Sequence, residues 1–474
     1  MAECILKAND GNGMGHLRRA LNLLLAAPEL AQSVELIAHQ GFQKFLEEFD
    51  RKFNTSLVPD CGWRLNLDTS LPYLKWNSPY AREFDQKAAL DMYYLSFIDA
   101  LGRNPRAKLV YVDDHNDPAA MLTGRAGKAL GLTRHPIKEL VPDAALAFLM
   151  QTQGYFDGCK DQMPKTRKEC FDIADYLLFP SHPEFIGAAA DFDFSNGNPE
   201  KVISLGFLVD QEVMGLFKQT DKRRVKNTLY GALEVDKANR KLIYCSFGAG
   251  EAADSILRAI FTAAQNQDYV FVIADPRGLL AKKAQEMYDV KLAFTCSRGT
   301  RLPTAARKIS LGNGRYVYIV NPGTSELHLK YLAASDVLLQ SNGSNTTYEA
   351  IAAGKPTINV HLPKPGFEQG FKALAMSANG LGEVLMLPGE ADMADRFREL
   401  VGPQPEFRYE QLSAQHLEAA IGRILDTPNF YGDNLAAAQR FITSPQTASQ
   451  ILANMMLRKN PQEIVDTLGL PRYE

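Results

Sequence analysis

The apolar residues of this chain fall into short runs that alternate with longer amphipathic segments. Residues 4–8 form an apolar run, a glycine-rich loop follows at 9–16, and residues 17–25 repeat like an amphipathic helix before a second run at 33–39. Short apolar runs that alternate with helical patterns are typical of parallel sheets covered by helices. This order predicts the start of a doubly wound α/β domain.

The same order starts again in the second half of the chain. An apolar run at 241–247 meets a glycine turn at 248–250, and a helix is predicted from Asp254. Further strands are predicted at 108–112, 144–150, 176–179, 201–207, 269–274, 316–320, 337–340, 357–361 and 383–387, and further helices at 327–334, 417–425 and 447–457. The predicted organisation is a first Rossmann-like domain at 1–210, a charged linker at 211–240, a second Rossmann-like domain at 241–455 and a helical C-terminal tail at 456–474.

Composition narrows the class of protein. The chain has 474 residues, enough for two or more domains, and a net charge of −3, which predicts no attraction to nucleic acid or to an anionic membrane. No apolar run reaches the roughly 18 residues of a transmembrane segment. Six cysteines without a CxxC pair, and a strand pattern that begins directly with no signal peptide, predict a cytoplasmic protein without disulfides or zinc.

The stretch 341–347, SNGSNTT, combines small and polar residues ahead of a short apolar helix that we predict from Tyr348 to Gly354. Ser, Asn and Thr are frequent N-cap residues, and the free N–H groups and positive dipole end of a helix start suit a phosphate. Glu349 falls within the first predicted turn or so, where a carboxylate can accept hydrogen bonds from a vicinal diol such as a ribose. An ordinary capped helix between two strands would show the same residues, so residue chemistry alone leaves both interpretations open.

The order of residues around this helix favours the first interpretation. The ordered residues are Gly343, Asn345, Thr346, Thr347, Glu349, Ala350, Gly354 and Pro356, followed by the pair Glu368 and Gln369. This order resembles the donor-binding signature of GT-B glycosyltransferases, of the inverting, nucleotide-sugar-dependent kind that includes the UDP-glycosyltransferases. The resemblance implies an α/β fold in which two doubly wound domains face each other across a cleft, the N-terminal one for the acceptor and the C-terminal one for the donor. It implies that the C-terminal tail, 456–474, returns as a helix toward the N-terminal domain. It also implies a UDP- or dTDP-sugar as donor substrate, with no cofactor required.

The resemblance assigns a role to each part of the signature. It implies that the pyrophosphate is held by Gly343, Ser344, Asn345, Thr346 and Thr347, the ribose by Glu349, and the sugar hydroxyls by Glu368 and Gln369. Further donor contacts are implied at Ser246, Gly248, Pro322 and Ser341, and at Gly13 and Gly15 of the N-terminal loop.

Two residues and the length of one loop depart from the signature. Family members have a His eight residues before their Glu, where this chain has Ser341, and an Asp where it has Glu368. The loop before Glu368 is two or three residues longer and includes Lys364 and Pro365. Retaining GT-B enzymes carry a Glu at the position of Ser341, so the serine favours inversion.

The N-terminal loop carries a candidate general base. Its glycines do not follow the GxGxxG spacing and no acid follows the second strand, so the loop does not predict NAD binding. His16, at the carboxyl edge of the predicted sheet, together with Gly15 and Arg19 resembles the Gly-His loop of inverting GT-B transferases, and also the GxGHxxR loop of related nucleotide-sugar hydrolases. In the transferases this His takes a proton from the acceptor, and an unperturbed pKa of ~6.5 suits that task. Without the resemblance, a structural histidine that caps the loop would be the simpler interpretation, and Arg19 would be a charged residue on an exposed helix face or a phosphate partner.

Asp113 and Asp114 follow the predicted strand 108–112 and therefore point to the same sheet edge as His16. GT-B transferases place an Asp here, and an Asp bonded to the imidazole would orient it and stabilise its charged form. The sequence does not distinguish the two, and a helix N-cap ahead of Pro118 would explain either one equally well.

The sequence analysis therefore predicts a hexosyl-type glycosyltransferase that transfers a sugar to an acceptor hydroxyl or amine with inversion. The helix near Asn345 would stabilise the departing diphosphate, and the chain has no DxD motif for a metal. A nucleotide-sugar hydrolase or epimerase on the same fold is the alternative, and a non-catalytic nucleotide- or glycan-binding protein is a third possibility. The acceptor and the oligomeric state stay open, and nucleic acid is not expected as a partner.

Overall fold

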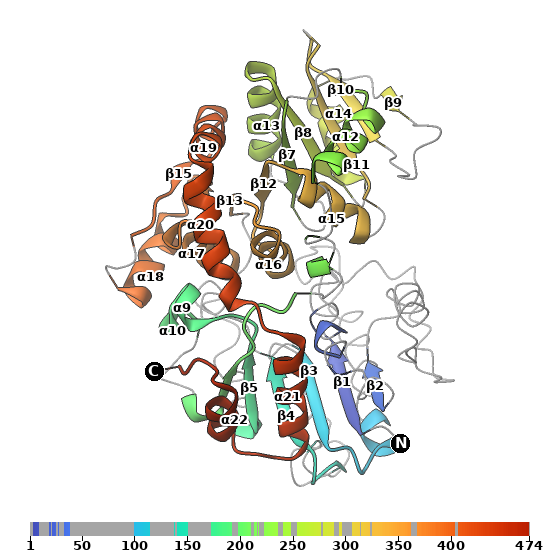
Figure 1. Ribbon diagram of the computed structural model, residues 1–474, viewed down its shortest axis with the longest axis vertical. Coiled ribbons are helices and arrows are strands. Elements are labelled where there is room, and N and C mark those ends of the chain that lie inside the picture. The colour runs from blue at the N-terminus through green and yellow to red at the C-terminus, as the bar shows by residue number, and fades with distance from the viewer. Residues whose placement is uncertain are drawn as a thin grey trace, which may run out of the picture. The chain divides into compact units, whose positions relative to one another are not determined.

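The computed structural model describes residues 3–8, 19, 21–24, 27, 33–37, 99–113, 137, 140–149, 172–191, 198–209, 213–215, 217, 222–235, 240–247, 254–275, 278–288, 293–295, 306–312, 314–322, 325–361, 367–402 and 406–473. Its contacts divide the chain into two compact units (Figure 1). Unit 1 consists of Met1–Glu184, Asp191–Leu208 and Thr443–Glu474, and unit 2 of Phe185–Ala190 and Val209–Ile442.

The sheet of unit 1 has six parallel strands in the order β2-β1-β3-β4-β5-β6. The strands are β1 (Cys4–Ala8), β2 (Val34–Ile37), β3 (Leu109–Asp113), β4 (Ala145–Leu149), β5 (Tyr176–Phe179) and β6 (Val202–Ser204). All strands predicted in this half of the chain are confirmed. Because β1 lies between β2 and β3, the strand order reverses there, and ligands of doubly wound sheets bind at the carboxyl ends of such strands. At that edge Ala8 pairs in register with Asp113.

The sheet of unit 2 has nine strands in the order β15-β14-β13-β12-β7-β8-β11-β10-β9. They are β7 (Lys241–Ser246), β8 (Tyr269–Ala274), β9 (Ala293–Thr295), β10 (Ala306–Ser310), β11 (Tyr316–Val320), β12 (Val337–Gln340), β13 (Thr357–Val360), β14 (Gly382–Met386) and β15 (Glu410–Gln411). The strands predicted in this half are confirmed. The antiparallel strands β9 and β10 and the two-residue strand β15 were not predicted.

Helices flank both sheets. In unit 2 they are α12 (Lys222–Ala232), α13 (Asp254–Asn266), α14 (Leu279–Tyr288), α15 (Ser325–Ala334), α16 (Ser344–Ala352), α17 (Glu368–Ala378), α18 (Ala391–Val401), α19 (Ala414–Asp426), α20 (Pro428–Ala438) and the 3-10 turn Gln439–Phe441. Further helices are α9 (Pro183–Ile186), α10 (Ala188–Asp191), the 3-10 turn Pro199–Lys201, α21 (Pro445–Met456) and α22 (Pro461–Leu468). In the part of the chain that the structure describes, none of them has the length and apolar composition needed to cross a membrane.

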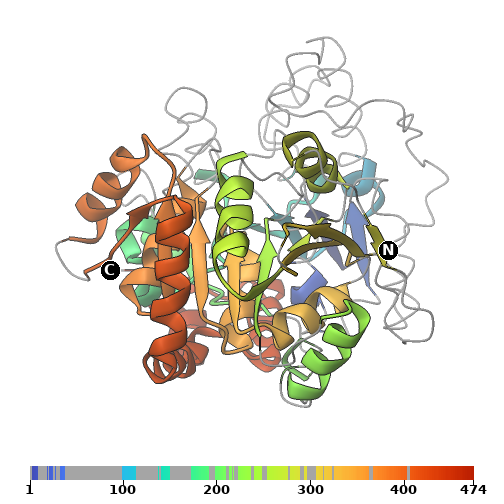
Figure 2. The ribbon, with the colours of Figure 1, turned by 90° about the horizontal axis from the view of Figure 1, so that it is seen from above.

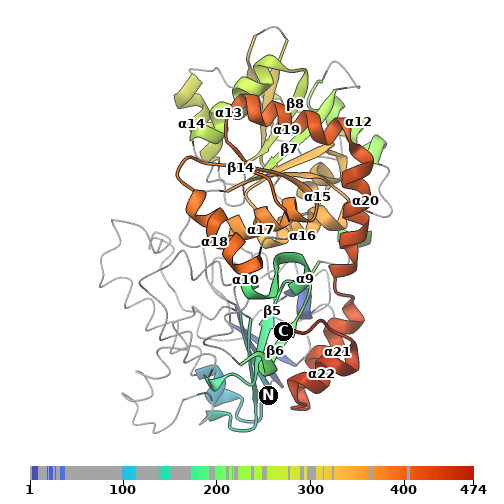
Figure 3. The same cartoon turned by 90° about the vertical axis from the view of Figure 1, so that its left-hand side faces the viewer.

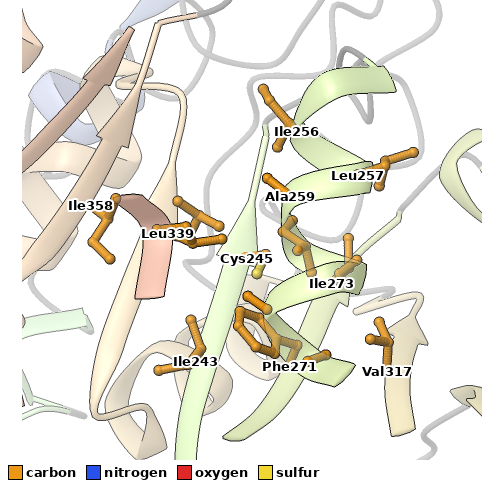
Figure 4. Close-up of a cluster of buried hydrophobic side chains, with 14 of the residues drawn as sticks. Ile243, Cys245, Ile256, Leu257, Ala259, Phe271, Ile273, Val317, Leu339 and Ile358 are labelled. Atoms are coloured by element: carbon orange, nitrogen blue, oxygen red, sulfur yellow. The ribbon is translucent and has the colours of Figure 1, made fainter. Parts of the chain in front are cut away.

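The second sheet is buried on both faces, with α13 and α19 side by side on one face and α15, α16 and α17 on the other (Figures 2 and 3). Successive side chains of a strand point to opposite faces, so a doubly covered strand needs apolar residues at every position. In β7, Ile243 and Cys245 enter the cluster formed with Ile256 of α13, as Figure 4 shows. Tyr244 is 0% exposed although its hydroxyl is polar. This double burial explains why the strands were visible in the sequence.

The C-terminal helices α21 and α22 belong to unit 1, although the sequence analysis placed residues 443–455 in the second domain. Their apolar side chains, among them Ile451 and Ile464, join the core of the first sheet. Thr443 fixes the point of return, because its backbone N–H donates to the Phe207 carbonyl at 3.1 Å. The amphipathic pattern of α21 shows that one face is buried, and the tertiary structure identifies the sheet that buries it.

Two other segments also differ from the predicted boundaries. The predicted linker 211–240 belongs to unit 2, where its helix α12 packs on α15. The stretch Phe185–Ala190 belongs to unit 2 as well, and its Phe185 carbonyl accepts a hydrogen bond from Asn379 Nδ2 at 2.9 Å. Both assignments depend on contacts between residues that are distant in the sequence.

A buried lysine makes the stability of unit 2 depend on pH. Lys355 is 7% exposed, and its Nζ donates a short hydrogen bond to the Ser335 carbonyl. Burial, and secondarily the charge of Lys222, lowers the pKa of Lys355 from 10.5 to about 7. The unfolded chain therefore binds more protons than the folded chain between pH 7 and 10.5.

We expect the free energy of unfolding to rise with pH through this window, by up to ~1.4 kcal/mol per pH unit, and Lys355→Met to remove that slope. Urea-induced unfolding at pH 7, 8 and 9 measures it. The control Lys282→Met, at a side chain that is 76% exposed, should keep the slope of the wild type. Equal slopes for wild type and Lys355→Met would contradict the prediction.

Candidate functional site

Helix α16 begins at Ser344 and not at Tyr348, so the second half of the predicted polar loop, residues 344–347, is the first turn of the helix itself. The N-cap is Gly343, which has no side chain, and the chain enters the helix through Asn342 with a φ of +59°. The first N–H groups of a helix have no partner within it, so Ser, Asn and Thr cost little at these positions. The polar side chains at 344–347 therefore do not distinguish a loop from the first turn of a helix.

The start of α16 lies where the strand order of the second sheet reverses. Gln340, the last residue of β12, pairs in register with Ser246 of β7 on one side and with Asn359 of β13 on the other. The helices that follow β7 and β12, α13 and α16, pack on opposite faces of the sheet (Figure 3). Such a reversal leaves a crevice at the carboxyl ends of the two strands. The first turn of α16 supplies free N–H groups and the positive end of the helix dipole there, which suits an anion.

Buried amides hold the backbone at this point. Gln340 Nε2 donates to Asn342 Oδ1 at 3.3 Å and to Asn359 Oδ1 at 3.1 Å, and Asn359 Nδ2 donates to Thr357 Oγ1 at 2.9 Å. All four residues are 0% exposed. The left-handed conformation of Asn342 costs roughly 1–3 kcal/mol for a residue other than glycine, and this network offsets the cost.

Two polar atoms beside this network have no hydrogen-bond partner among the residues that the structure describes. They are Nδ2 of Asn342 and Oγ1 of Thr347, both in fully buried residues. A buried polar atom without a partner costs about 1–3 kcal/mol and calls for a ligand or an ordered water. Their position at the start of α16 is consistent with a polar ligand at this edge.

Glu349 lies in the second turn of α16, one turn later than predicted, because the helix starts earlier. Its side chain is 5% exposed, and its Oε2 is 3.4 Å from Nε2 of His328 on α15. The other ring nitrogen of His328, Nδ1, is 2.7 Å from the hydroxyl of Tyr244 on β7. The sequence analysis did not single out His328 or Tyr244, since each occupies an ordinary position in an apolar helix or strand.

The other predicted donor contacts of unit 2 are at the same sheet edge. Ser246 is the last residue of β7 and is 7% exposed, Ser341 directly follows β12 and is 4% exposed, and Pro322 follows β11. Asn345 and Thr346 lie partly exposed in the first turn of α16. Gly248 and the side chain of Ser344 lie outside the described residues.

Glu368 and Gln369 are the first two residues of α17. A carboxylate in the first turn of a helix interacts favourably with the dipole. The carboxylate of Glu368 also forms a short ion pair with Lys372, one turn along, whose side chain is 3% exposed. Lys372 thus partly neutralises the charge of Glu368 before any ligand binds.

A second acid–histidine contact at this edge was not predicted. His361 directly follows β13, and its Nε2 is 3.6 Å from Oε1 of Glu390, in the loop after β14. Both side chains are largely buried, and burial raises the pKa of Glu390 to about 7 although a backbone hydrogen bond from Leu387 opposes the shift. Only the neighbouring order of β13 and β14 brings the two residues together.

In unit 1, the structure places Asp113 at the carboxyl end of β3, fully buried, with Arg19 as an ion-pair partner. Arg19 NH2 is 3.1 Å from Asp113 Oδ1, and Arg19 is 7% exposed. The interpretation of Arg19 as a residue of an exposed helix face is therefore wrong. Gly13, Gly15, His16 and Asp114 lie outside the described residues, so the pairing of His16 with either aspartate stays a prediction.

This architecture matches solved structures over nearly their full length. The UDP-GlcNAc 2-epimerase from Neisseria meningitidis, bound to UDP-GlcNAc, is 13% identical with a TM-score of 0.53, and the match covers 96% of this chain and 99% of that one. HepE from Anabaena, in complex with UDP-glucose, is 13% identical with a TM-score of 0.54, and the match covers 96% of this chain and 100% of that one. A UDP-glucosyltransferase from Polygonum tinctorium that is capable of glucosylating indoxyl is 12% identical with a TM-score of 0.51, and the match covers 99% of each chain. The chain has the GT-B fold.

At these identities the similarity establishes the GT-B architecture, as predicted, and leaves the chemistry to the side chains. No protein-family model and no curated protein matches the sequence. Within the described ranges, no three His, Cys, Asp or Glu residues come together as a metal site.

We expect the Arg19–Asp113 pair to contribute strongly to the stability of unit 1. Removing one partner leaves the other charge buried, which typically costs about 3–5 kcal/mol. Arg19→Met and Asp113→Asn should each lower the free energy of unfolding, and the double variant should lose clearly less than the sum of both. Urea-induced unfolding followed by circular dichroism measures the three values. If the losses in the free energy of unfolding were additive, the two side chains would contribute to stability independently of each other.

Proposed function

We propose that the protein is a glycosyltransferase that moves a sugar from a UDP- or dTDP-sugar to an acceptor hydroxyl or amine with inversion. The observation that carries the proposal is the start of α16 at the reversal point of the second sheet, with buried polar groups around it and Glu349 in the same helix. The GT-B fold supports it, because the similar solved structures include glycosyltransferases and a protein in complex with UDP-glucose.

In this proposal the donor binds along the carboxyl edge of the second sheet. The pyrophosphate accepts hydrogen bonds from the first turn of α16, at Gly343, Ser344, Asn345, Thr346 and Thr347, with Ser341 beside them. Glu349 binds the ribose hydroxyls, and Glu368 and Gln369 bind the sugar. Ser246, Gly248 and Pro322 contact the nucleotide, and Gly13 and Gly15 allow the N-terminal loop to approach the donor closely.

The proposed reaction is a single displacement. The acceptor oxygen or nitrogen forms a bond to the anomeric carbon on the face opposite the leaving group, and its proton passes to the imidazole of His16. The bond between the anomeric carbon and the phosphate oxygen breaks, and its electron pair stays on the nucleoside diphosphate. The positive end of α16 stabilises that charge, so the proposal includes no metal.

Asp113 and Asp114 are both retained as candidates for the residue that orients His16. Asp113 lies in register with Ala8, directly before the loop that carries His16, which favours it by position. Its ion pair with Arg19 neutralises part of its charge, which reduces the stabilisation that it offers an imidazolium.

A nucleotide-sugar epimerase or hydrolase is the second candidate. The similarity to the Neisseria meningitidis UDP-GlcNAc 2-epimerase, at a TM-score of 0.53, favours it. In that case the sugar itself or water replaces the acceptor. A cytoplasmic location belongs to either proposal, and the buried free thiols of Cys4 and Cys245 support it.

Nucleotide binding tests the donor site without knowledge of the acceptor. We expect UDP or dTDP to raise the melting temperature, with and without magnesium, while GDP, ADP and CMP do so less. A ligand at ~100 times its dissociation constant adds ~2.7 kcal/mol to stability, which a thermal-shift assay detects easily. A series without any shift would reject the donor site, and a shift that requires magnesium would reject the metal-free mechanism.

The variant His16→Ala tests the proposed base. General-base catalysis contributes roughly 10²–10⁴-fold, so we expect turnover of the donor to fall by that factor while the thermal shift with nucleotide stays unchanged. Product analysis of the wild type without acceptor identifies free sugar or an epimer and thus separates the second candidate from transfer. Unchanged turnover in His16→Ala would reject His16 as the base, and nucleotide binding without any turnover would favour a non-catalytic protein.

A further inference from the structure

Behind Glu349 the structure places a chain of two further polar side chains from different elements. Glu349 Oε2 on α16 is 3.4 Å from His328 Nε2 on α15, and His328 Nδ1 is 2.7 Å from the Tyr244 hydroxyl on β7. The side chains of Glu349 and His328 are 5% and 15% exposed, and Tyr244 is 0% exposed. Side chains from β7, α15 and α16 therefore form one chain of polar contacts that ends at the Glu349 carboxylate.

Tyr244 is a rigid, protonated end of this chain. Its ring stacks on that of Tyr331 at 5.4 Å and 16°, and it also contacts the ring of His328 at 5.5 Å. Burial raises the pKa of Tyr244 well above 10, and neighbouring Tyr331, Cys245 and Glu349 add to the shift. The phenol therefore keeps its proton and can donate it to Nδ1 of His328.

The partners of His328 place a proton on Nε2 in either charge state. A neutral imidazole that accepts from Tyr244 at Nδ1 carries its proton on Nε2, which faces the carboxylate. An imidazolium carries protons on both nitrogens, and the Tyr244 oxygen then accepts. In both cases the polarised Nε2–H group lies 3.4 Å from Glu349 Oε2, which is a contact between opposite charges and not an aligned hydrogen bond.

We propose that Tyr244 and His328 are positioning residues that hold the Glu349 carboxylate in the orientation in which it binds the ribose hydroxyls of the nucleotide. This inference rests on the proposed function, which assigns Glu349 to the ribose. A glutamate has three rotatable side-chain bonds, and a carboxylate that is already oriented loses less freedom when the nucleotide binds. Residues behind a binding residue contribute in this way without touching the ligand.

The test compares a nucleotide that carries the ribose hydroxyls with one that lacks them. The probes are UDP and 2′,3′-dideoxy-UDP, and isothermal titration calorimetry measures both dissociation constants. Tyr244→Phe removes only the hydroxyl that holds His328, and His328→Leu removes the polar group beside the Glu349 carboxylate. His328→Gln keeps an N–H near the position of Nε2. Tyr331→Phe is the matched control, because it removes a hydroxyl from the ring stacked on Tyr244.

We expect Tyr244→Phe and His328→Leu to weaken UDP binding by roughly 3- to 10-fold, the usual effect of one hydrogen bond, and to leave 2′,3′-dideoxy-UDP unaffected. His328→Gln should recover most of the UDP affinity, and Tyr331→Phe should change neither dissociation constant. In the background Glu349→Ala, Tyr244→Phe should have no further effect on UDP. Thermal unfolding without ligand confirms that each variant is folded.

Three other outcomes would overturn the inference, and each has a different cause. An equal loss for both nucleotides, or a comparable loss in Tyr331→Phe, would mean that the residues only support the local packing. Equal wild-type affinity for UDP and its dideoxy form would show that Glu349 does not bind the ribose, while the pyrophosphate site of the proposed function would stand. A wild-type protein that binds neither nucleotide would reject both the inference and the UDP-dependent form of the proposed function.

Discussion

The abrupt start of α16 after β12, an inner strand of the second sheet, is the constraint on which the candidate donor site depends. β12 lies between β7 and β13, so its end is buried and the chain turns into the helix within three residues. Asn342 makes this turn with a positive φ, and the amides of Gln340 and Asn359 hold it there. The same turn leaves the first N–H groups of α16 at the sheet edge and sets Glu349 in the second turn, within reach of α15.

Burial of charge explains how the candidate carboxylates are arranged. A charge that leaves water requires an opposite charge or hydrogen-bond donors, because desolvation otherwise costs several kcal/mol. Asp113 is met by Arg19, Glu349 by His328, and Glu368 by Lys372. Each of these acids thus lies beside a group of opposite or potentially opposite charge before a ligand arrives. A ligand hydroxyl or imidazole at these positions would share the carboxylate with the partner already present.

Much of the fold could be predicted because parallel strands covered on both faces are apolar at nearly every position. β7 and β11 are examples, since only their first residues are not fully buried. The antiparallel strand β10 was missed because its sequence, ARKIS, is charged at two of five positions and resembles a loop. The start of α16 was misplaced because Ser, Asn and Thr are as acceptable in the first turn of a helix as they are ahead of it.

The sequence by itself determined where the doubly covered parallel strands lie, that the β–loop–α–β pattern occurs twice, and that a candidate phosphate-binding helix follows β12. These properties depend on local periodicity and on the order of residue types. Only the tertiary structure decided that α21 belongs to the unit of the first sheet, that Arg19 is buried against Asp113, and that His328 and Tyr244 stand behind Glu349. These contacts join residues from separate elements, and their positions follow from strand order and helix packing, which no local pattern of hydrophobic and polar residues encodes.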